Sequence, residues 1–548
     1  MKIVKPDPIT TTGYVTRTGT ATYYDSNGYL KTSADGALRF GYNPSSLEFN
    51  GLIVEDAATN YIDYSNTFND VSWTNRDVTY SSGQLSPENL TNATKIIPNT
   101  VNGQHNIRTS ALSTPVVGNT YVASIYVKAS GYNIVRLSFG NFDGTNAYYF
   151  RLDTGTVGIK VGEFDPVVEK LSNGFYRLGI PITAQSTSFL LFGVSICVQE
   201  SLAFYQGDGV SGVICYGAQT EIGSRMTSYI ATNGLAVSRS AEVITGSGLL
   251  YTNVTNPYSE WSSATTYSLG QIVVVGTYTG SNIVDITNSG TYKSLTNSNL
   301  NNNPITSPTS WVRIGPTNQF AVFDNVISSS TVKDSDIVFV VKSASIDSVA
   351  VLNSVANKIS FTVSDASYSE TFLYNIAHTR TTQLNGSDSI DWFSYFFFDE
   401  YVQKTQAIYL DIPQVTNGIV SIKISGTVNV TAGSFIEGQV KLLGATQYGA
   451  SAGITDYSKK EVDEFGNTVL VVRNYSKRMQ AKMFLSNSNL NTVQRILYSI
   501  RATPVLWIAS DDSQLEEPMI VMGYYKDFDT EIAYPAHSLC NLTIEGLI

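Results

Sequence analysis

The chain has 548 residues, and its 45 acidic residues exceed its 34 basic residues by 11. Charged residues make up only 14%, against about 25% in an ordinary soluble protein, while 34 tyrosines and many hydroxyl residues supply polar and aromatic surface. The acidic balance without a basic run excludes nucleic acid as the expected partner, and no apolar stretch approaches the roughly 20 residues of a membrane-spanning helix.

Length and composition indicate several β domains. At roughly 100 to 200 residues per domain, the length predicts three to five units. A chain rich in Thr, Tyr, Val, Gly and Asn favours strands and turns over helices. We expect a mainly β protein with tandem antiparallel β-sandwiches of jelly-roll type, a small β module and a C-terminal α+β domain. The expected segments are an N-terminal β docking segment (1–50), a jelly-roll sandwich (51–245), a small aromatic module (246–318), a second sandwich (319–445) and the α+β domain (446–548).

Residues 1–50 contain short alternating pieces such as GYVTRTGTATYYD, separated by turn signals at Asp25–Gly28 and Asp35–Gly36. A segment this short cannot bury a core of its own, so we expect it to dock on another part of the protein. The start of the chain also lacks the apolar stretch of a signal peptide. We therefore expect a protein that is made and kept in a cytoplasm, or is released from it by lysis.

Between 51 and 245, strands recur with turns between them, as in YVASIYVKAS, FYRLGIPI and FLLFGVSICV, and this spacing predicts an antiparallel β-sandwich. Five stretches also carry a resemblance: GLIVEDAATNYIDYSNTFNDVSWT, ASIYVKAS, RLDTGTVG, NGFYRLGI and GAQTEIGSRMTSYIATNG. In this order they resemble the carbohydrate-binding-type jelly-roll domain that recurs in bacteriophage tail and fibre proteins. The resemblance implies a virion component with a glycan-binding-like fold.

The ribbon GAQTEIG allows two interpretations of Glu221. It resembles the final core strand of such a domain, where alternation places Gln219 and Glu221 on one face of the sheet. Glycoside hydrolysis would need a second carboxylate about 5 to 9.5 Å away, and the sequence identifies none. We expect a structural or sugar-contacting role for Glu221 and assign no catalytic residue.

Residues 246–318 carry a series of aromatic residues in the order Trp261, Tyr267, Tyr292 and Trp311. This order is similar to small chitin-binding modules of carbohydrate-binding families 5 and 12, and the resemblance implies that the four rings stack on glycan. The hairpin 276–289 is longer than that pattern usually has. The alternative is that the rings form the core of a tiny domain, which needs large side chains to bury enough area.

A second alternating set of strands, 319–445, predicts another sandwich. It contains SIDWFSYFFFDEYV (389–402), the most aromatic stretch of the chain. The carboxylates around this stretch lack the ligand spacing of a calcium loop, so we expect no metal there. An aromatic loop with acidic residues at its rim favours a contact with a neighbouring subunit, through Trp392, Phe393, Tyr395, Phe396, Phe397 and Phe398.

Residues 446–548 combine strand patterns with a helical pattern. Alternating strands are followed by NLNTVQRILYSIRATP, which has apolar residues at helical spacing before Pro504: Val493, Ile496, Leu497 and Ile500. Strands follow again, which predicts an α+β domain. Together with GQVKLLGATQYGASAGITDYSKKE, this pattern resembles a C-terminal block shared by phage tail-associated proteins, and the resemblance implies location more than chemistry.

No motif for catalysis or cofactor binding is present in the sequence. None of the three histidines (His105, His378, His537) lies in a nucleophile motif, and there is no phosphate-binding loop, dinucleotide fingerprint or HExxH. The three cysteines lie in apolar alternating segments, which predicts buried thiols rather than disulfides or a metal site: Cys197, Cys215 and Cys540. We expect no enzyme activity, no cofactor and no bound metal.

These observations predict a structural component of a bacteriophage tail, as a fibre, sleeve or baseplate-associated protein. It would be assembled in the host cytoplasm and reside in the tail of the virion, with other copies of itself, other tail proteins and host-surface polysaccharide as partners. Low charge reduces the desolvation cost of an interface, and tyrosine offers large contact area with few rotamers to order. Two alternatives stay open: a tail-borne glycan hydrolase or lyase, and a free glycan-binding lectin.

Overall fold

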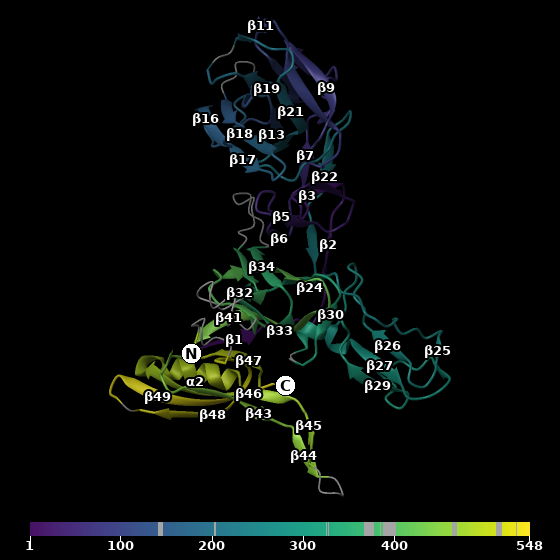
Figure 1. The fold of residues 1–548 in the computed structure, drawn as a ribbon, viewed down its shortest axis with the longest axis vertical. Coiled ribbons are helices and arrows are strands. Elements are labelled where there is room, and N and C mark those ends of the chain that lie inside the picture. The colour runs from purple at the N-terminus through teal and green to yellow at the C-terminus, as the bar shows by residue number, and fades with distance from the viewer. Residues whose placement is uncertain are drawn as a thin grey trace. The chain divides into compact units, whose positions relative to one another are not determined.

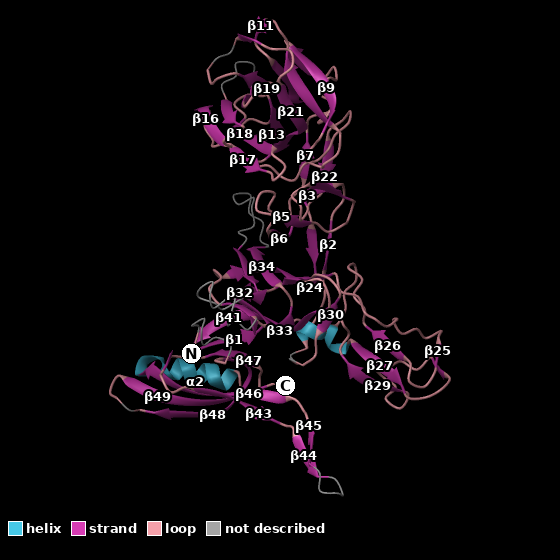
Figure 2. Ribbon diagram, viewed as in Figure 1, coloured by secondary structure: helices cyan, strands magenta, loops and turns pink. Residues whose placement is uncertain are grey.

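The computed structural model describes residues 1–140, 146–201, 204–324, 326, 328–365, 378–383, 385–386, 402–462, 468–510, 518–532 and 534–547 (Figure 1). Within these residues the fold is mainly β, with antiparallel sheets and one α-helix, α2 (Leu490–Ser499). Figure 2 shows how strands dominate the structure. The predicted fold class is therefore confirmed. Among the described helices, none is long and apolar enough to span a membrane.

The chain forms two compact units. Unit 1 combines Met1–Tyr14 with the described residues from Thr245 onward, and unit 2 comprises Val15–Ile244. Unit 2 is thus inserted in the chain between the first strand of unit 1 and the rest of that unit. This division is coarser than the five segments expected from the sequence, whose boundaries stay a prediction.

Unit 2 is built around two antiparallel sheets of six strands each, with the orders β17-β18-β13-β21-β10-β9 and β16-β15-β14-β19-β12-β8. Their strands are β8 (Trp73–Arg76), β9 (Val78–Gln84), β10 (Ala93–Pro98), β12 (Asn106–Leu112), β13 (Thr120–Ser130), β14 (Ile134–Gly140), β15 (Ala147–Arg151), β16 (Thr156–Val161), β17 (Val167–Lys170), β18 (Tyr176–Thr183), β19 (Leu190–Cys197) and β21 (Gly212–Ile222).

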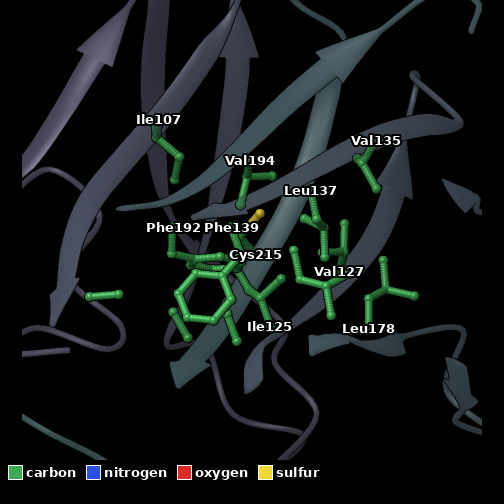
Figure 3. Packing of buried hydrophobic residues seen from close by; sticks show 14 of the residues in the cluster. Ile107, Ile125, Val127, Val135, Leu137, Phe139, Leu178, Phe192, Val194 and Cys215 are labelled. Atoms are coloured by element: carbon green, nitrogen blue, oxygen red, sulfur yellow. The ribbon is translucent and has the colours of Figure 1, made fainter. Parts of the chain in front are cut away.

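The two sheets of unit 2 pack face to face through one apolar core. Ile125 and Val127 of β13 lie in this core with Leu137 of β14, Val194 of β19 and Cys215 of β21 (Figure 3). Alternation explains the pattern, because every second residue of a strand points to the same face of its sheet. All three cysteines of the chain are buried free thiols, as the sequence predicts.

Short strand pairs accompany the sandwich in unit 2. The predicted turn at Asp25–Gly28 joins two of these strands, since the Gly28 N–H donates to Asp25 O at 2.9 Å and the φ of Gly28 is 77°. Glycine adopts such a left-handed φ without the steric cost that other residues carry. The pairs are β3 (Ala21–Tyr24) with β4 (Leu30–Ser33), β5 (Phe40–Tyr42) with β6 (Phe49–Leu52), β7 (Ala58–Asn60) with β22 (Val237–Arg239), and β11 (Asn102–Gly103) with β20 (Tyr205–Gln206).

The largest sheet of unit 1 joins strands from both ends of the chain. Its order is β38-β33-β41-β1-β47-β48-β49-β46-β42, with β30 paired to β41 and β43 paired to β46. In its middle lies β1 (Lys2–Pro6), where Val4 pairs with Val440 on one side and Leu506 on the other. The other strands are β30 (Thr331–Lys333), β33 (Ser348–Val355), β38 (Ala407–Tyr409), β41 (Val430–Leu442), β42 (Ala445–Thr446), β43 (Ser451–Asp456), β46 (Tyr475–Ser486), β47 (Val505–Ile508), β48 (Ile520–Glu531) and β49 (His537–Gly546).

The two faces of this large sheet carry different apolar clusters. Val4, Leu506 and Met522 belong to a cluster on one face. On the other face, Val349 and Phe435 pack against a second sheet of order β24-β31-β40-β34-β35. This second sheet consists of β24 (Gly248–Thr252), β31 (Ile337–Lys342), β34 (Lys358–Asp365), β35 (His378–Gln383) and β40 (Gly418–Ser425).

Helix α2 covers another part of the large sheet. Val493 and Leu497 of the helix share a buried cluster with Ile500 and with Trp507 of β47. These are the positions at which the sequence places a helical apolar stripe. The helix ends at Ser499, before Pro504, as the sequence predicts.

Candidate functional site

Glu221 is fully buried, and three hydrogen bonds hold its carboxylate. Gln219 Nε2 and the Thr227 N–H donate to Oε1 at 2.8 and 2.9 Å, and Thr227 Oγ1 donates to Oε2 at 2.6 Å. Gln219 and Glu221 therefore meet on one face of β21, as alternation predicts. Burial raises the pKa of Glu221. The contacts tie the loop after β21 back to the strand, which is a structural role.

Next to Thr227 in the chain, Ser228 belongs to a buried ion-pair cluster that sequence reasoning missed. Arg39 Nη2 lies 2.8 Å from Glu55 Oε2 and 2.5 Å from Glu242 Oε1, and Arg239 Nη1 lies 2.8 Å from the same Glu55 oxygen. Ser228 donates its N–H and its Oγ to Glu55 at 2.8 and 2.7 Å. Both arginines are only 1% exposed.

The electrostatics of this cluster fix Glu55 in its charged form. Burial alone would raise its pKa, but Arg239, Arg39 and the hydrogen bonds from Ser228 lower it to about 2. Removing one partner of a buried ion pair leaves an uncompensated charge, which is strongly destabilising. The cluster therefore joins four distant stretches of unit 2 and serves its stability.

A second polar group is buried in unit 2 around Arg177. Its guanidinium lies 5.3 Å from the centroid of the Tyr126 ring and donates from Nη1 to Thr227 O at 2.7 Å. Tyr24 donates its hydroxyl to Glu169 Oε2 at 2.7 Å, and burial raises the pKa of Glu169. Perturbed titratable groups gather at functional sites and in structural networks alike. Here each named group has a protein partner, which favours the structural role.

The four aromatic residues expected to bind glycan gather in one small module of unit 1. Tyr267, Tyr292 and Trp311 are buried with Val273, and half-buried Trp261 packs against them. The Tyr267 and Trp311 rings meet edge to face at 5.2 Å. The module consists of β25 (Thr266–Tyr267), β26 (Ile272–Val275), β27 (Gly290–Ser294), β28 (Asn299–Leu300) and β29 (Trp311–Gly315). These rings form its core, as the alternative interpretation holds, and glycan stacking on them stays a prediction.

Two of the three histidines have described side chains, and both contact other parts of the protein. His105 is buried with Nδ1 2.6 Å from Asp77 O and Nε2 2.9 Å from Tyr205 O. His537 stacks on Phe484 with ring centroids 4.5 Å apart. Among the described residues, no group of three or more His, Cys, Asp or Glu side chains is placed to hold a metal ion.

The expected subunit contact lies outside the described residues, and it stays a prediction. Its aromatic residues are Trp392, Phe393, Tyr395, Phe396, Phe397 and Phe398.

Unit 1 contains a cavity of about 640 Å³ with charged and aromatic walls. Asp7, Asp324 and Arg313 line it together with Phe323. Arg313 Nη2 donates to Ser289 O at 3.0 Å, and burial raises the pKa of Asp324. Carboxylates beside an aromatic ring are groups that suit a polar ligand such as a sugar.

A second feature of unit 1 is an exposed two-stranded ribbon with a hollow at its base. The ribbon is formed by β44 (Lys459–Val462) and β45 (Thr468–Val471), and Figure 1 shows it continuing from β43 and leaving the large sheet. The hollow measures about 590 Å³, and Val472 and Tyr475 line it where β45 leads into β46. The sequence predicts strands in this region but not their exposure.

Comparison with known proteins gives only distant likenesses. No protein family profile matches the sequence, and no curated protein matches it. An enzymatically active domain of tailspike protein 4 from bacteriophage CBA120 is 14% identical with a TM-score of 0.20, covering 30% of this chain and 21% of its own. The CBM22-1–GH10 modules of a Clostridium thermocellum xylanase are 14% identical with a TM-score of 0.19, covering 33% and 30%.

A third solved structure matches over a longer range. The tandem CBM51 modules of a family 98 glycoside hydrolase from Streptococcus pneumoniae SP3-BS71 are 10% identical with a TM-score of 0.17, covering 70% of this chain and 99% of theirs. This chain spans 21% and 30% of the first two proteins. Likenesses of this size do not assign a function.

Proposed function

We propose that this protein is a structural component of a bacteriophage tail, a fibre, sleeve or baseplate-associated protein that assembles with copies of itself and with other tail proteins. Contact with host-surface polysaccharide is its second role. The motifs of 51–245 occur in the same order as in the jelly-roll domains of phage tail proteins, and the C-terminal block resembles phage tail-associated proteins. Both resemblances support a location in the tail. The confirmed β architecture is compatible with a structural role.

The observation that carries an assembly role is the exposed ribbon β44–β45. Val462 and Leu470 are 62% and 70% exposed, although both are large apolar side chains. A two-stranded ribbon without a covered face is marginally stable in water, and an exposed apolar strand pair invites pairing with another chain. Burial in an assembly resolves both problems.

Imaging of purified virions from the phage that encodes this chain tests the proposal. Gold-labelled antibody against the protein should decorate the tail, and density for two β-rich units should be present there. Virions that lack the label on the tail while the same antibody detects the purified protein would contradict the proposal.

A tail-borne glycan hydrolase or lyase is the second candidate, and the cavity with Asp7 and Asp324 favours it. Glycosidases use two carboxylates on either side of the scissile bond. If this function holds, incubation with host capsule or lipopolysaccharide shortens the polymer, and Asp324→Asn abolishes the shortening. Polymer of unchanged length after prolonged incubation with the folded protein would remove this candidate.

A further inference from the structure

The cavity of about 640 Å³ in unit 1 lies where segments that are far apart in the sequence meet. Residues 5–10 form one wall, and side chains of the small aromatic module, including Arg313, form a second. Phe323 and Asp324 belong to a third. Pockets for small ligands measure roughly 300 to 1,000 Å³, so the cavity has the size of a ligand site.

Hydrogen bonds fix the first wall to the second. The Ile286 N–H donates to Thr10 O at 2.9 Å, and the Thr12 N–H donates to Val284 O at 3.1 Å. Prolines stiffen the walls further, because the ring fixes the φ of its residue: Pro6, Pro8, Pro316 and Pro504. A ligand therefore meets a preformed site, in which the cost of ordering protein groups is small.

The cavity offers a small apolar surface. Phe323 is only partly buried, and its ring packs edge to face on Phe339 and Phe435, with centroids 5.7 and 6.2 Å apart. Ile9 and Ile286 line the cavity and are also only partly buried. These side chains present a fixed apolar surface of limited extent, which suits one face of a small ring rather than a long apolar chain.

Three charged side chains at the cavity have hydrogen-bonding capacity that the fold does not use. Lys5, Asp7 and Arg313 are all exposed. Within the described residues, neither the Lys5 ammonium nor the Asp7 carboxylate has a hydrogen bond or an ion pair. Arg313 uses only Nη2, which donates to Ser289 O at 3.0 Å, so its other N–H groups are open to a ligand.

Asp324 is a fourth polar group, and the fold holds it in place. The Val326 N–H donates to its Oδ1 at 2.8 Å, and Ser329 Oγ donates to its Oδ2 at 2.6 Å. Burial raises the pKa of Asp324, whereas Ser329, the Val326 N–H and Arg313 lower it. Each carboxylate oxygen can accept a further hydrogen bond, so Asp324 is a positioned acceptor.

The balance of charge selects the class of ligand. Lys5 and Arg313 stand against Asp7 and Asp324, so neither an anion nor a cation meets walls of only the opposite sign. An uncharged ligand that both donates and accepts hydrogen bonds can use all four groups. Sugar hydroxyls do both, and the C–H face of a sugar ring fits a small apolar surface. An extended peptide is instead recognised through a row of backbone groups, whereas the spare groups here are side chains from separate segments.

We infer that this cavity binds a neutral saccharide, with Asp7 and Asp324 accepting hydrogen bonds from its hydroxyls and with Lys5 and Arg313 donating to its oxygens. None of the four rings that the sequence suggests for glycan binding lines this cavity. The inference rests on the proposed function, of which contact with host-surface polysaccharide is the second role, and it names the surface that makes this contact.

Isothermal titration calorimetry of the full-length protein tests the ligand class. The probes are neutral hexasaccharides of glucose, galactose, mannose, rhamnose or N-acetylglucosamine, with hexagalacturonate as the anionic probe and an uncharged peptide of serine, threonine and tyrosine as the peptide probe. At least one neutral hexasaccharide should bind, and the anionic and peptide probes should bind at least about tenfold more weakly. The inference is overturned if no neutral hexasaccharide binds, or if the anionic probe or the peptide binds more tightly.

Substitutions on opposite walls test the location. Asp7→Ala and Arg313→Met should each weaken binding of the hexasaccharide by about tenfold or more, because each removes a charged hydrogen-bonding group. The matched controls are Asp529→Ala and Lys293→Met, at exposed positions outside the cavity lining, and they should bind as the wild type does. Circular dichroism checks that all four variants are folded. Equal affinity of the cavity variants and their controls would show that the saccharide binds elsewhere, and the inference would fail.

The outcome also separates the inference from the proposed function. If antibody labels the virion tail but the protein binds none of the neutral hexasaccharides, the inference fails and the structural role in the tail stands. If the cavity variants lose binding but the tail carries no label, the saccharide site stands and the proposed location fails. Asp324 is unchanged in these variants, so the test for polysaccharide cleavage remains separate.

Discussion

Val4, in the first strand of the chain, pairs with Leu506, near its end, and both side chains are buried on the same face of the large sheet. The large sheet of unit 1 is therefore complete only when the first strand of the chain pairs with strands near its end. Strands that are separated in sequence by the whole of unit 2 depend on one another for their hydrogen bonds and their core.

Replacing Leu506 tests this dependence. Leu506→Ala should lower the free energy of unfolding of unit 1 by about 2 to 5 kcal/mol, because it removes buried methyl groups and leaves a cavity. Urea unfolding followed by tryptophan fluorescence measures the change. Leu269→Ala, at a site 60% exposed, is the matched control and should alter the same free energy by less than about 0.5 kcal/mol.

The Glu55 cluster makes unit 2 sensitive to acid. The pKa of Glu55 is about 2 in the folded protein and 4.5 in its ordinary state, so its contribution to stability is present above pH 4.5 and is lost as the pH falls toward 2. Each unit of this difference corresponds to about 1.4 kcal/mol. In thermal unfolding experiments between pH 4.5 and 2, unit 2 of Glu55→Gln should lose less stability than the wild type does. It should also destabilise the neutral protein by about 3 to 5 kcal/mol, because Arg239 loses the charge of Glu55 and Arg39 is left with Glu242 alone. An unchanged melting temperature at neutral pH would contradict the structural role of the cluster.

Glu437 should give unit 1 the opposite pH dependence. Burial, together with nearby Asp7, raises its pKa to about 8 from 4.5, and its Oε2 has no hydrogen-bond partner among the described residues. The folded state therefore holds a proton that the unfolded state releases, so stability falls as the pH rises from about 4.5 to 8. Glu437→Gln keeps the neutral shape and should be more stable than the wild type above pH 8. If calorimetry finds the variant less stable at that pH, Glu437 is ionised in the fold.

Replacing Trp311 should destabilise the small aromatic module, because Trp311 is one of its core residues. Trp311 is 2% exposed and its Nε1 donates to Asn302 O at 2.9 Å. Trp311→Ala should cost about 3 to 5 kcal/mol and expose the module to proteolysis. Limited digestion with mass analysis of the fragments reports the effect. A variant that resists digestion as well as wild type while losing binding to chitin would instead support the glycan-stacking interpretation.

Local sequence patterns correctly predicted the features that are set by residues close together in the sequence. The alternation of β13 and the helical spacing of Val493 and Leu497 lead directly to buried positions, because periodicity alone decides which face is apolar. The turn at Asp25–Gly28 follows from residue types that favour it.

Long-range contacts could not be predicted in the same way. Arg39, Glu55 and Arg239 come from separate segments, and each alone reads as an ordinary surface charge. The position of β1 between β41 and β47 depends on pairing across most of the chain. The strands β44 and β45 have strand-forming residues, but their sequences do not show that Val462 and Leu470 are exposed, which only the three-dimensional arrangement reveals.

The mass of the purified full-length protein in solution tests the central claim of self-assembly most directly. At micromolar concentration and neutral pH, native mass measurement should find a discrete multiple of the 59.6 kDa chain. A single species of 59.6 kDa that persists at high concentration and cleaves polysaccharide would contradict it.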